Sequence, residues 1–298
     1  MKILVIGGSS ILGYKLLQFF IKKKINVEYT FYKTKIPVKN GHVLDIRNED
    51  DTIKTINEIK PTHVILVAAL TNLDLCESDH DLADSVNIKS TENIITACKK
   101  AKSSLIYVST SFVFNGEKTE YYEDDPIKPS TYYGKTKGKS EELVRKSGLK
   151  FLILRTDALY DWIEKWQRDN SVTRALKSLR AGKILREVND WYNTPTYVKD
   201  FVLATFKLIE NNKEGIYHLS GSEYINRYNW SLNVADVFKL MKNTESINSN
   251  ELNLSAKRVN INLKNNKLYN DVGILMKNTK EGLEDMMNIE KQNNCKKI

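Results

Sequence analysis

Two side chains four residues apart, Tyr133 and Lys137, have the types and the spacing for acid–base chemistry. On a helix, residues four apart share one face, so the phenol and the ammonium group would be neighbours. A protonated lysine beside a phenol favours phenolate and lowers the pKa of the tyrosine toward working pH. Such a tyrosine can pass a proton to or from a substrate oxygen while hydride moves at the adjacent carbon.

The spacing alone is not specific, because Tyr29 and Lys33 repeat it in a predicted strand. Tyr133 differs in its context, since Ser130 or Thr131 can cap a helix that begins there. Ahead of it, the apolar stretch 104–109 predicts a buried strand that ends in the hydroxyls of residues 109–111. Ligands bind at the carboxyl ends of parallel strands, so Thr110 could hydrogen-bond the same substrate oxygen as Tyr133.

The first residues of the chain have the pattern of a dinucleotide cradle. Four apolar residues, Ile3 to Ile6, lead into Gly7, Gly8 and then Gly13, which lies inside a predicted helix. The N–H groups at the start of such a helix face a pyrophosphate. Ser10 replaces the middle glycine of the usual Gly-x-x-Gly-x-x-Gly motif, and its hydroxyl could bond a phosphate, whereas its Cβ narrows the approach of the backbone. Without a ligand, the stretch would be an ordinary strand–helix turn.

Further residues at predicted strand ends fit the rest of such a cofactor. No carboxylate follows the second strand, whereas Lys33 and Lys35 do, which favours a cofactor with a 2′-phosphate over a solvated basic turn. Asp45 ends the third strand and could bond the adenine amino group. The small residues of the stretch 68–71 would let a flat cofactor pass close by.

Apolar strands and helices alternate along the first half of the chain. We predict strands at 3–6, 26–32, 42–46, 63–69, 104–109 and 150–155, with helices at about 10–21, 49–59, 82–100 and from 132. This alternation predicts an α/β fold with a doubly wound parallel sheet. Later elements are expected at 171–179, 198–210, 215–219, 230–241 and 278–287, and residues 291–298 are expected to fray.

We therefore predict two parts. A dinucleotide-binding domain spans 1–155, with a return contribution from about 196–212. A smaller C-terminal part that binds substrate comprises 156–195 and 213–298.

Composition excludes several classes of function. The net charge of +9 comes with no basic stretch interleaved with aromatic residues, so nucleic acid is not an expected partner. The three cysteines and four isolated histidines have no metal-site or redox spacing, which indicates no metal and a reducing cytoplasm. Apolar runs are no longer than strands and Lys2 leads directly into the first one, so neither a membrane span nor a signal peptide is expected.

With these motifs in this order, the chain resembles the extended short-chain dehydrogenase/reductases, and more closely the dTDP-4-dehydrorhamnose reductases. The stretches that carry the resemblance are Ser109–Phe114, Tyr133–Lys137, Leu154–Thr156, Asn189–Asp190, Pro195–Thr196 and Gly215–Leu219. It implies a Rossmann fold and NADPH-dependent reduction, with NADH possible, of the 4-keto group of a nucleotide-linked deoxysugar in dTDP-rhamnose biosynthesis. A homodimer is compatible with it.

The resemblance also assigns roles to individual residues. Thr110, Tyr133 and Lys137 would be catalytic, and Thr110 and Ser111 would contact the substrate. The implied cofactor site consists of Gly7, Ser10, Ile11, Leu12 and Gly13 at the pyrophosphate, Lys33 at the 2′-phosphate, Asp45 and Ile46 at the adenine, Ala68, Ala69 and Leu70 at the middle of the cofactor, and Tyr133 and Lys137.

Three positions depart from the reductase pattern. Ser10 replaces a glycine, Ser111 replaces an aspartate beside the catalytic threonine, and Ala158 replaces a tryptophan that packs on the substrate. The regulatory β-subunits of methionine adenosyltransferase share the fold and cofactor site, and the stretch His218–Gly221 is compatible with them. Two alternatives therefore stay open, an NADP-binding regulatory subunit and a sugar-nucleotide epimerase or dehydratase that retains its cofactor.

Overall fold

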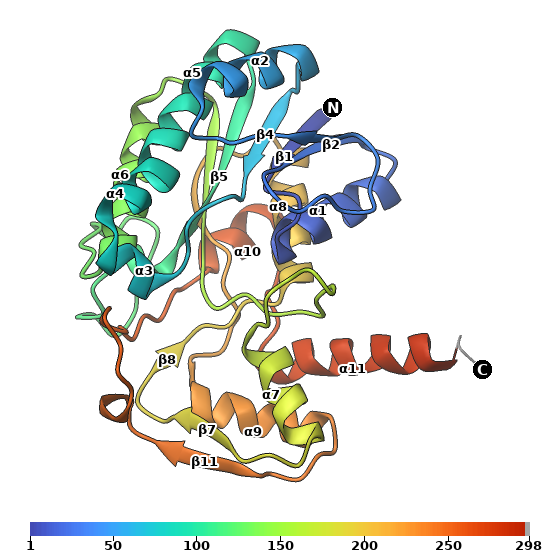
Figure 1. Cartoon of the computed structure of the whole chain (residues 1–298), viewed down its shortest axis with the longest axis vertical. Helices are drawn as coiled ribbons and strands as arrows, with labels where there is room; N and C mark the ends of the chain where they lie inside the picture. The colour runs from blue at the N-terminus through green and yellow to red at the C-terminus, as the bar shows by residue number, and fades with distance from the viewer. Residues whose placement is uncertain (296–298) are drawn as a thin grey trace.

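The computed structural model describes residues 1–295, and the side chains of residues 1–293. Its centre is a seven-stranded parallel sheet in the order β3-β2-β1-β4-β5-β6-β9 (Figure 1). The strands are β1 (Lys2–Ile6), β2 (Asn26–Phe31), β3 (Gly41–Val43), β4 (His63–Leu66), β5 (Ser104–Thr110), β6 (Phe151–Thr156) and β9 (Gly215–His218). The predicted doubly wound parallel sheet is confirmed.

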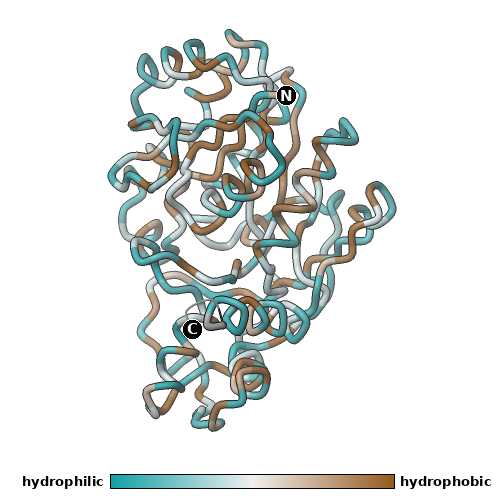
Figure 2. Tube along the Cα trace, turned by 90° about the vertical axis from the view of Figure 1, so that its right-hand side faces the viewer, coloured by the Kyte–Doolittle hydropathy of each residue, from teal (hydrophilic) through white to brown (hydrophobic). Residues whose placement is uncertain are grey.

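Helices cover both faces of this sheet, which explains why its strands are apolar at successive positions. Along β1, Ile3 and Val5 join one core cluster, whereas Leu4 and Ile6 join the other. The first cluster lies under α1 (Ile11–Lys22), α8 (Val198–Glu210) and α10 (Asn266–Val272), and the second under α2 (Glu49–Ile59), α5 (Ser90–Ala101) and α6 (Tyr132–Lys146). In Figure 2 the hydrophobic stretches accordingly gather along the central strands.

The helix predicted over 82–100 is helical throughout, but it is not one regular α-helix. The chain instead forms α3 (Leu73–Ser78), α4 (His80–Ala83) and a π-helical turn, η1 (Asp84–Lys89), before α5 begins. The buried amide of Asn87 explains the turn: its Oδ1 accepts from the Leu70 N–H at 2.9 Å, and its Nδ2 donates to the Leu70 carbonyl and to Thr136 Oγ1. Asn87 thereby links the loop after β4 to α6.

The smaller part of the molecule lies below the carboxyl ends of the strands in Figure 1. It contains α7 (Ser171–Arg180), β7 (Leu185–Val188), β8 (Tyr192–Asn193), β10 (Ile225–Asn226), α9 (Arg227–Val237), β11 (Thr244–Ile247) and α11 (Thr279–Cys295). β7 pairs with β11 in a parallel ladder and β8 pairs with β10 in an antiparallel one.

Helix α11 runs to Cys295, so the expected fraying is wrong for residues 291–295, and residues 296–298 lie outside the described residues. Within the described residues, no helix has both the length and the apolar character that a membrane crossing requires.

Candidate active site and cofactor cleft

A cleft of ≈ 660 Å³ lies at the carboxyl ends of the first four strands of the sheet. Cofactor sites commonly occupy roughly 300–1,000 Å³, so the cleft has room for a dinucleotide. Of the predicted cofactor residues, it is lined by Gly7, Ser10, Ile11, Lys33, Asp45, Ile46, Ala68 and Ala69. Leu12, Gly13, Leu70, Tyr133 and Lys137, which were also predicted to bind the cofactor, do not line it.

The turn between β1 and α1 requires its glycines, because atoms of the protein lie where their Cβ atoms would be. Gly7 has φ +94°, and a Cβ on it would lie 2.8 Å from the Ala68 nitrogen. A Cβ on Gly13 would lie 2.2 Å from the Gly7 carbonyl oxygen, so Gly13 lets the helix pack against the turn. Leu12 is buried beneath the turn. Leu12 and Gly13 therefore shape the cradle from beneath, whereas Ile11 lines the cleft itself.

Ser10 caps helix α1. Its hydroxyl donates to the Gly7 carbonyl at 2.8 Å and accepts from the Gly13 N–H at 3.0 Å. Because the single hydroxyl proton is already donated to Gly7, the structure does not support the interpretation in which this group donates to a phosphate. The N–H groups of Ile11 and Leu12 lie at the N-terminus of the helix and have no acceptor within it. The Ser10 cap does not use them.

We expect Ser10→Ala to lower the free energy of unfolding by about 1 kcal/mol, the usual contribution of an N-cap, and Ser10→Gly to lower it by a few tenths. Urea denaturation measures both, with Ser9→Ala as the control. NADPH affinity should stay nearly constant. A tenfold loss of NADPH affinity with unchanged stability would instead make the hydroxyl a phosphate ligand.

A basic edge of the cleft surrounds the exposed ring of Tyr32. Lys33 Nζ lies 5.5 Å and the Arg47 guanidinium carbon 5.6 Å from the ring centroid, and both residues line the cleft. Arg47 also forms a bidentate pair with Asp45, and this pairing holds the pKa of that carboxyl below its usual range. Asp45, predicted at the adenine, is therefore engaged by Arg47, and Lys35 does not line the cleft.

We expect Lys33→Gln combined with Arg47→Gln to narrow the preference for NADPH over NADH. A hydrogen bond to a charged group contributes about 1.5–3 kcal/mol, so losing such contacts to a 2′-phosphate should weaken NADPH binding tenfold or more. NADH affinity should change little, and Lys35→Gln is the matched control. Equal affinities of the unmodified protein for the two cofactors would contradict this assignment.

A segment of the smaller part, residues 161–170, reaches the glycine turn and closes one side of the cleft. Trp166 Nε1 and Gln167 Nε2 both donate to the Ser9 carbonyl, at 3.2 and 3.1 Å. The Trp166 indole packs edge-on against Tyr14 of α1 at 5.4 Å, and Asn170 Nδ2 ties the ends of the segment together by donating to the Asp161 carbonyl at 2.7 Å. We call residues 161–170 the strap.

The predicted catalytic hydroxyls meet at the end of β5. Tyr133, in the first turn of α6, is 7% exposed, and its phenol lies beside the Thr110 hydroxyl. Burial raises the pKa of Tyr133, and the nearby Thr110 hydroxyl opposes this rise. The phenol is consequently protonated at neutral pH, which is the form that donates a proton.

The expected effect of Lys137 on Tyr133 is wrong for this structure. Lys137 lies on the same helix, but its Nζ donates to the Val108 carbonyl at 2.8 Å and lies 4.1 Å from the centroid of the Tyr107 ring. Burial lowers the pKa of Lys137 to about 7, although the nearby negative charge of Glu141 acts to raise it. The ammonium group thus sits against β5, two residues before Thr110, and burial governs the pKa of the phenol.

A buried ion pair fixes the helix that carries Tyr133. Arg155 on β6 donates through Nε and Nη2 to Glu141 on α6, at 3.0 and 2.7 Å, and Ser109 Oγ donates to the same carboxylate at 2.6 Å. Both charged residues are 1% exposed. Next to the pair, burial and the Arg155 charge lower the pKa of His218 to about 3, which keeps this imidazole neutral.

The sequence analysis missed several residues around the site. Arg47 had a usable signal, because it follows the predicted adenine residue by two positions. Asp157 also had one, since a carboxylate within two residues of the end of a predicted strand lies at the ligand edge of the sheet. Trp166 and Gln167 had none, because their partner Ser9 is far away in sequence.

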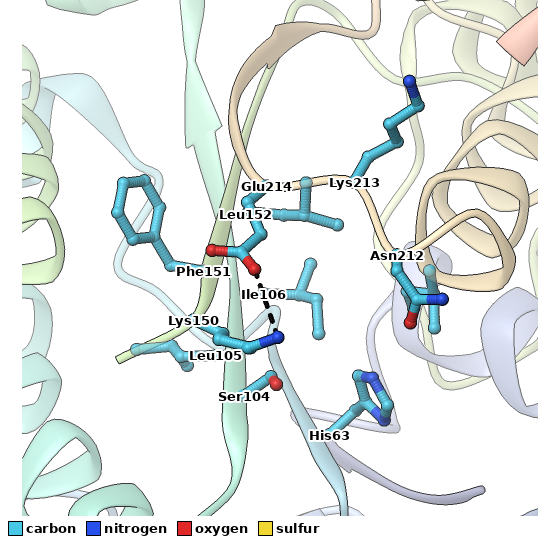
Figure 3. Close-up of a pocket in the computed structure, with 11 residues that line it drawn as sticks. His63, Ser104, Leu105, Ile106, Lys150, Phe151, Leu152, Asn212, Lys213 and Glu214 are labelled. Carbon is cyan, nitrogen blue, oxygen red and sulfur yellow. Dashed lines mark ion pairs between the residues drawn. The ribbon is translucent and has the colours of Figure 1, made fainter. Parts of the chain in front are cut away.

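A second pocket, of ≈ 50 Å³, lies at the opposite edge of the sheet, where β4, β5 and β6 begin (Figure 3). Its lining includes His63, Ser104 and an ion pair between Lys150 and Glu214 at 3.5 Å. It is too small for a cofactor and lies away from the carboxyl ends of the strands, where parallel sheets bind ligands.

The fold and the relatives described below identify an NAD(P)-dependent oxidoreductase of the extended short-chain dehydrogenase/reductase type. The family model described as the RmlD substrate binding domain matches residues 1–292. The chain belongs to this family, and the resemblance to dTDP-4-dehydrorhamnose reductases is confirmed.

Individual relatives agree with this membership. The chain is 31% identical over 216 residues to a dTDP-4-dehydrorhamnose reductase of Aggregatibacter actinomycetemcomitans. The aligned residues cover 69% of this chain and 72% of the relative. It is 29% identical to the methionine adenosyltransferase 2 subunit beta of Xenopus tropicalis, over 80% of this chain and 72% of the relative. A solved dTDP-4-dehydrorhamnose reductase from Bacillus anthracis, in complex with NADP, superposes with a TM-score of 0.87 at 25% identity, over 97% of this chain and 99% of that one.

Proposed function

We propose that the protein reduces the 4-keto group of a nucleotide-linked deoxysugar with NADPH, as in the formation of dTDP-rhamnose, and that NADH can replace NADPH. The observation that carries this proposal is the nearness of the Tyr133 phenol to the Thr110 hydroxyl at the end of β5. The two residues provide a protonated acid and a second hydroxyl at one point of the ligand edge. The relatives and the solved neighbour support the same chemistry.

In this proposal the cofactor lies in the 660 Å³ cleft, and the residues that line it fit a dinucleotide. Gly7 and the N-terminus of α1 would hold the pyrophosphate, and Lys33 with Arg47 would hold a 2′-phosphate. When bound, NADPH supplies the hydride. Asn87 connects the cleft to the acid, because it joins Leu70, next to the cleft residues Ala69 and Thr71, to Thr136 on the helix of Tyr133.

Tyr133 would donate its proton to the substrate oxygen as negative charge develops there, and Thr110 would hydrogen-bond the same oxygen. Lys137, held by the Val108 carbonyl and with its pKa lowered to about 7, would supply positive charge near the reacting groups in its protonated form. The smaller part, residues 156–195 and 213–298 without β9, would bind the sugar nucleotide.

A second candidate is an NADP-binding regulatory subunit. The observation that favours it is that Lys137 bonds a backbone carbonyl and not the phenol, together with alanine at position 158. A regulatory subunit would use the same cleft but would need no acid.

One experiment separates the two candidates. The purified protein is incubated with NADPH and a panel of 4-keto sugar nucleotides, and the loss of reduced-cofactor absorbance is followed. We expect turnover with at least one of them. Cofactor binding without oxidation by any keto sugar would favour the regulatory subunit.

A further inference from the structure

Arg168 is a cation of the strap that has no partner in the fold. The strap has five charged residues, and the structure describes all of them. Asp161 pairs with Lys15 of α1 at 3.3 Å, and Asp169 pairs with Lys177 of α7 at 2.8 Å. Of the five, only Arg168 lines the cleft, and its exposed side chain makes no ion pair and no hydrogen bond with the described residues. Its guanidinium is therefore free for a ligand in the cleft.

The strap anchors the backbone on both sides of Arg168. On one side, Gln167 donates to the Ser9 carbonyl at 3.1 Å, while its Oε1 accepts from the Glu164 N–H at 3.0 Å. On the other side, Asn170 caps α7 with its side chain. Because both neighbouring stretches are bonded, Arg168 occupies a defined position in the wall of the cleft.

This position lies at the glycine turn, where the proposed pyrophosphate site is. Ser9, whose carbonyl accepts from Gln167, directly precedes the cap of α1. Consecutive Cα atoms are about 3.8 Å apart, so the Arg168 side chain begins one residue away from a contact with the turn. The adenine end of the cleft, at Asp45, already has its own cation in Arg47. The strap thus brings a free cation to the start of α1.

The charges that line the cleft fit an anion. Its cations are Lys33, Arg47 and Arg168, and Asp45 is the only carboxylate that lines it among the described residues. The lining therefore has an excess of positive charge. A pyrophosphate diester carries a negative charge on each phosphate, and a guanidinium can bind such oxygens through two parallel hydrogen bonds.

We propose that Arg168 binds the pyrophosphate of the cofactor from the strap, together with the N–H groups at the start of α1. The smaller part of the molecule thereby helps to hold the cofactor. Because NADPH and NADH share the pyrophosphate, Arg168 contributes to the affinity for both, whereas Lys33 and Arg47 are assigned to the 2′-phosphate. This inference rests on the proposed function, since it names a further ligand of the cofactor that the proposed reaction uses.

The test measures binding by isothermal titration calorimetry and needs no turnover. The ligands are NADPH, NADH, ADP-ribose, which keeps the pyrophosphate without the nicotinamide, and adenosine 2′-monophosphate, which lacks the pyrophosphate. We expect Arg168→Gln to weaken NADPH, NADH and ADP-ribose by a similar factor, roughly tenfold or more, because each loses a hydrogen bond between charged groups. The affinity for adenosine 2′-monophosphate should stay unchanged.

Two further variants on the strap make the test specific. Lys165→Gln removes an exposed cation that does not line the cleft, and it should bind every ligand as the unmodified protein does. Arg168→Lys keeps the charge but loses the paired hydrogen bonds, so its affinities should fall between those of the unmodified protein and Arg168→Gln. Urea denaturation should give the same unfolding midpoint for all of these proteins, because neither side chain has a partner in the fold.

The outcomes separate this inference from the proposed function. Unchanged affinities in Arg168→Gln would overturn the inference. A loss confined to NADPH and adenosine 2′-monophosphate would also overturn it, because Arg168 would then bind the 2′-phosphate. The expected losses, in a protein that oxidises NADPH with no keto sugar, would uphold the inference and overturn the reductase function. An unmodified protein that binds neither NADPH nor ADP-ribose would overturn both.

Discussion

Tyr133→Phe is expected to lower turnover by ~100-fold or more while NADPH affinity stays nearly unchanged. The phenylalanine ring fills the same buried space, so the fold loses only the hydroxyl next to Thr110. That hydroxyl acts as charge develops on the substrate oxygen, so its loss raises the barrier and leaves ground-state binding almost intact. Steady-state kinetics and a cofactor titration measure the two effects separately.

Tyr132→Phe is the control for this experiment. Tyr132 is the preceding residue, and its ring stacks on His80 while its hydroxyl bonds Asp84 at 3.0 Å, away from Thr110. Its replacement should leave turnover within a few-fold of normal. Full activity of the Tyr133→Phe variant would refute the assigned acid.

Glu141→Gln is expected to lower the free energy of unfolding by about 3–5 kcal/mol, because it leaves the buried guanidinium of Arg155 without its counter-charge. This is a large part of the stability of a typical domain. The same change loosens the attachment of α6 to the ends of β5 and β6, so activity should fall together with stability. Urea denaturation monitored by circular dichroism measures the first effect.

The next residue provides the comparison. Glu142 is exposed and pairs with Lys139 and Lys146 at the surface, so Glu142→Gln should hardly change stability. The double variant Glu141→Leu and Arg155→Met should be more stable than Glu141→Gln, since it removes both buried charges. Similar unfolding midpoints for Glu141→Gln and Glu142→Gln would contradict the role given to the ion pair.

The sheet could be predicted from the sequence because its strands are buried on both faces. Runs such as Ile3 to Ile6 and residues 104–109 are continuous apolar stretches, and the helices between them are amphipathic. The local pattern of apolar and polar residues is enough to predict such strands and helices. The interruption at Asn87 was missed because its cause is the set of bonds that this amide makes with Leu70 and Thr136, which the local sequence does not reveal.

The site was only partly predictable for the same reason. The nearness of Thr110 and Tyr133 could be predicted from their types and their order in the chain, because strand ends meet at one edge of a parallel sheet. The direction of the Lys137 side chain was not predictable, since it depends on a carbonyl of β5. The capping role of Ser10 depends on the conformation of the turn. That conformation cannot be predicted from the presence of a serine alone.

The strap limits how this protein can be divided or recombined. A fragment that ends at residue 155 would lose the two donors to the Ser9 carbonyl, the ring packed on Tyr14, and also α8 and β9, which complete the sheet and cover α1. Such a fragment would expose a broad apolar surface and one open side of the cradle. A chimaera that takes its nucleotide half from this chain and its sugar half from a relative must therefore carry residues 161–170 with the nucleotide half.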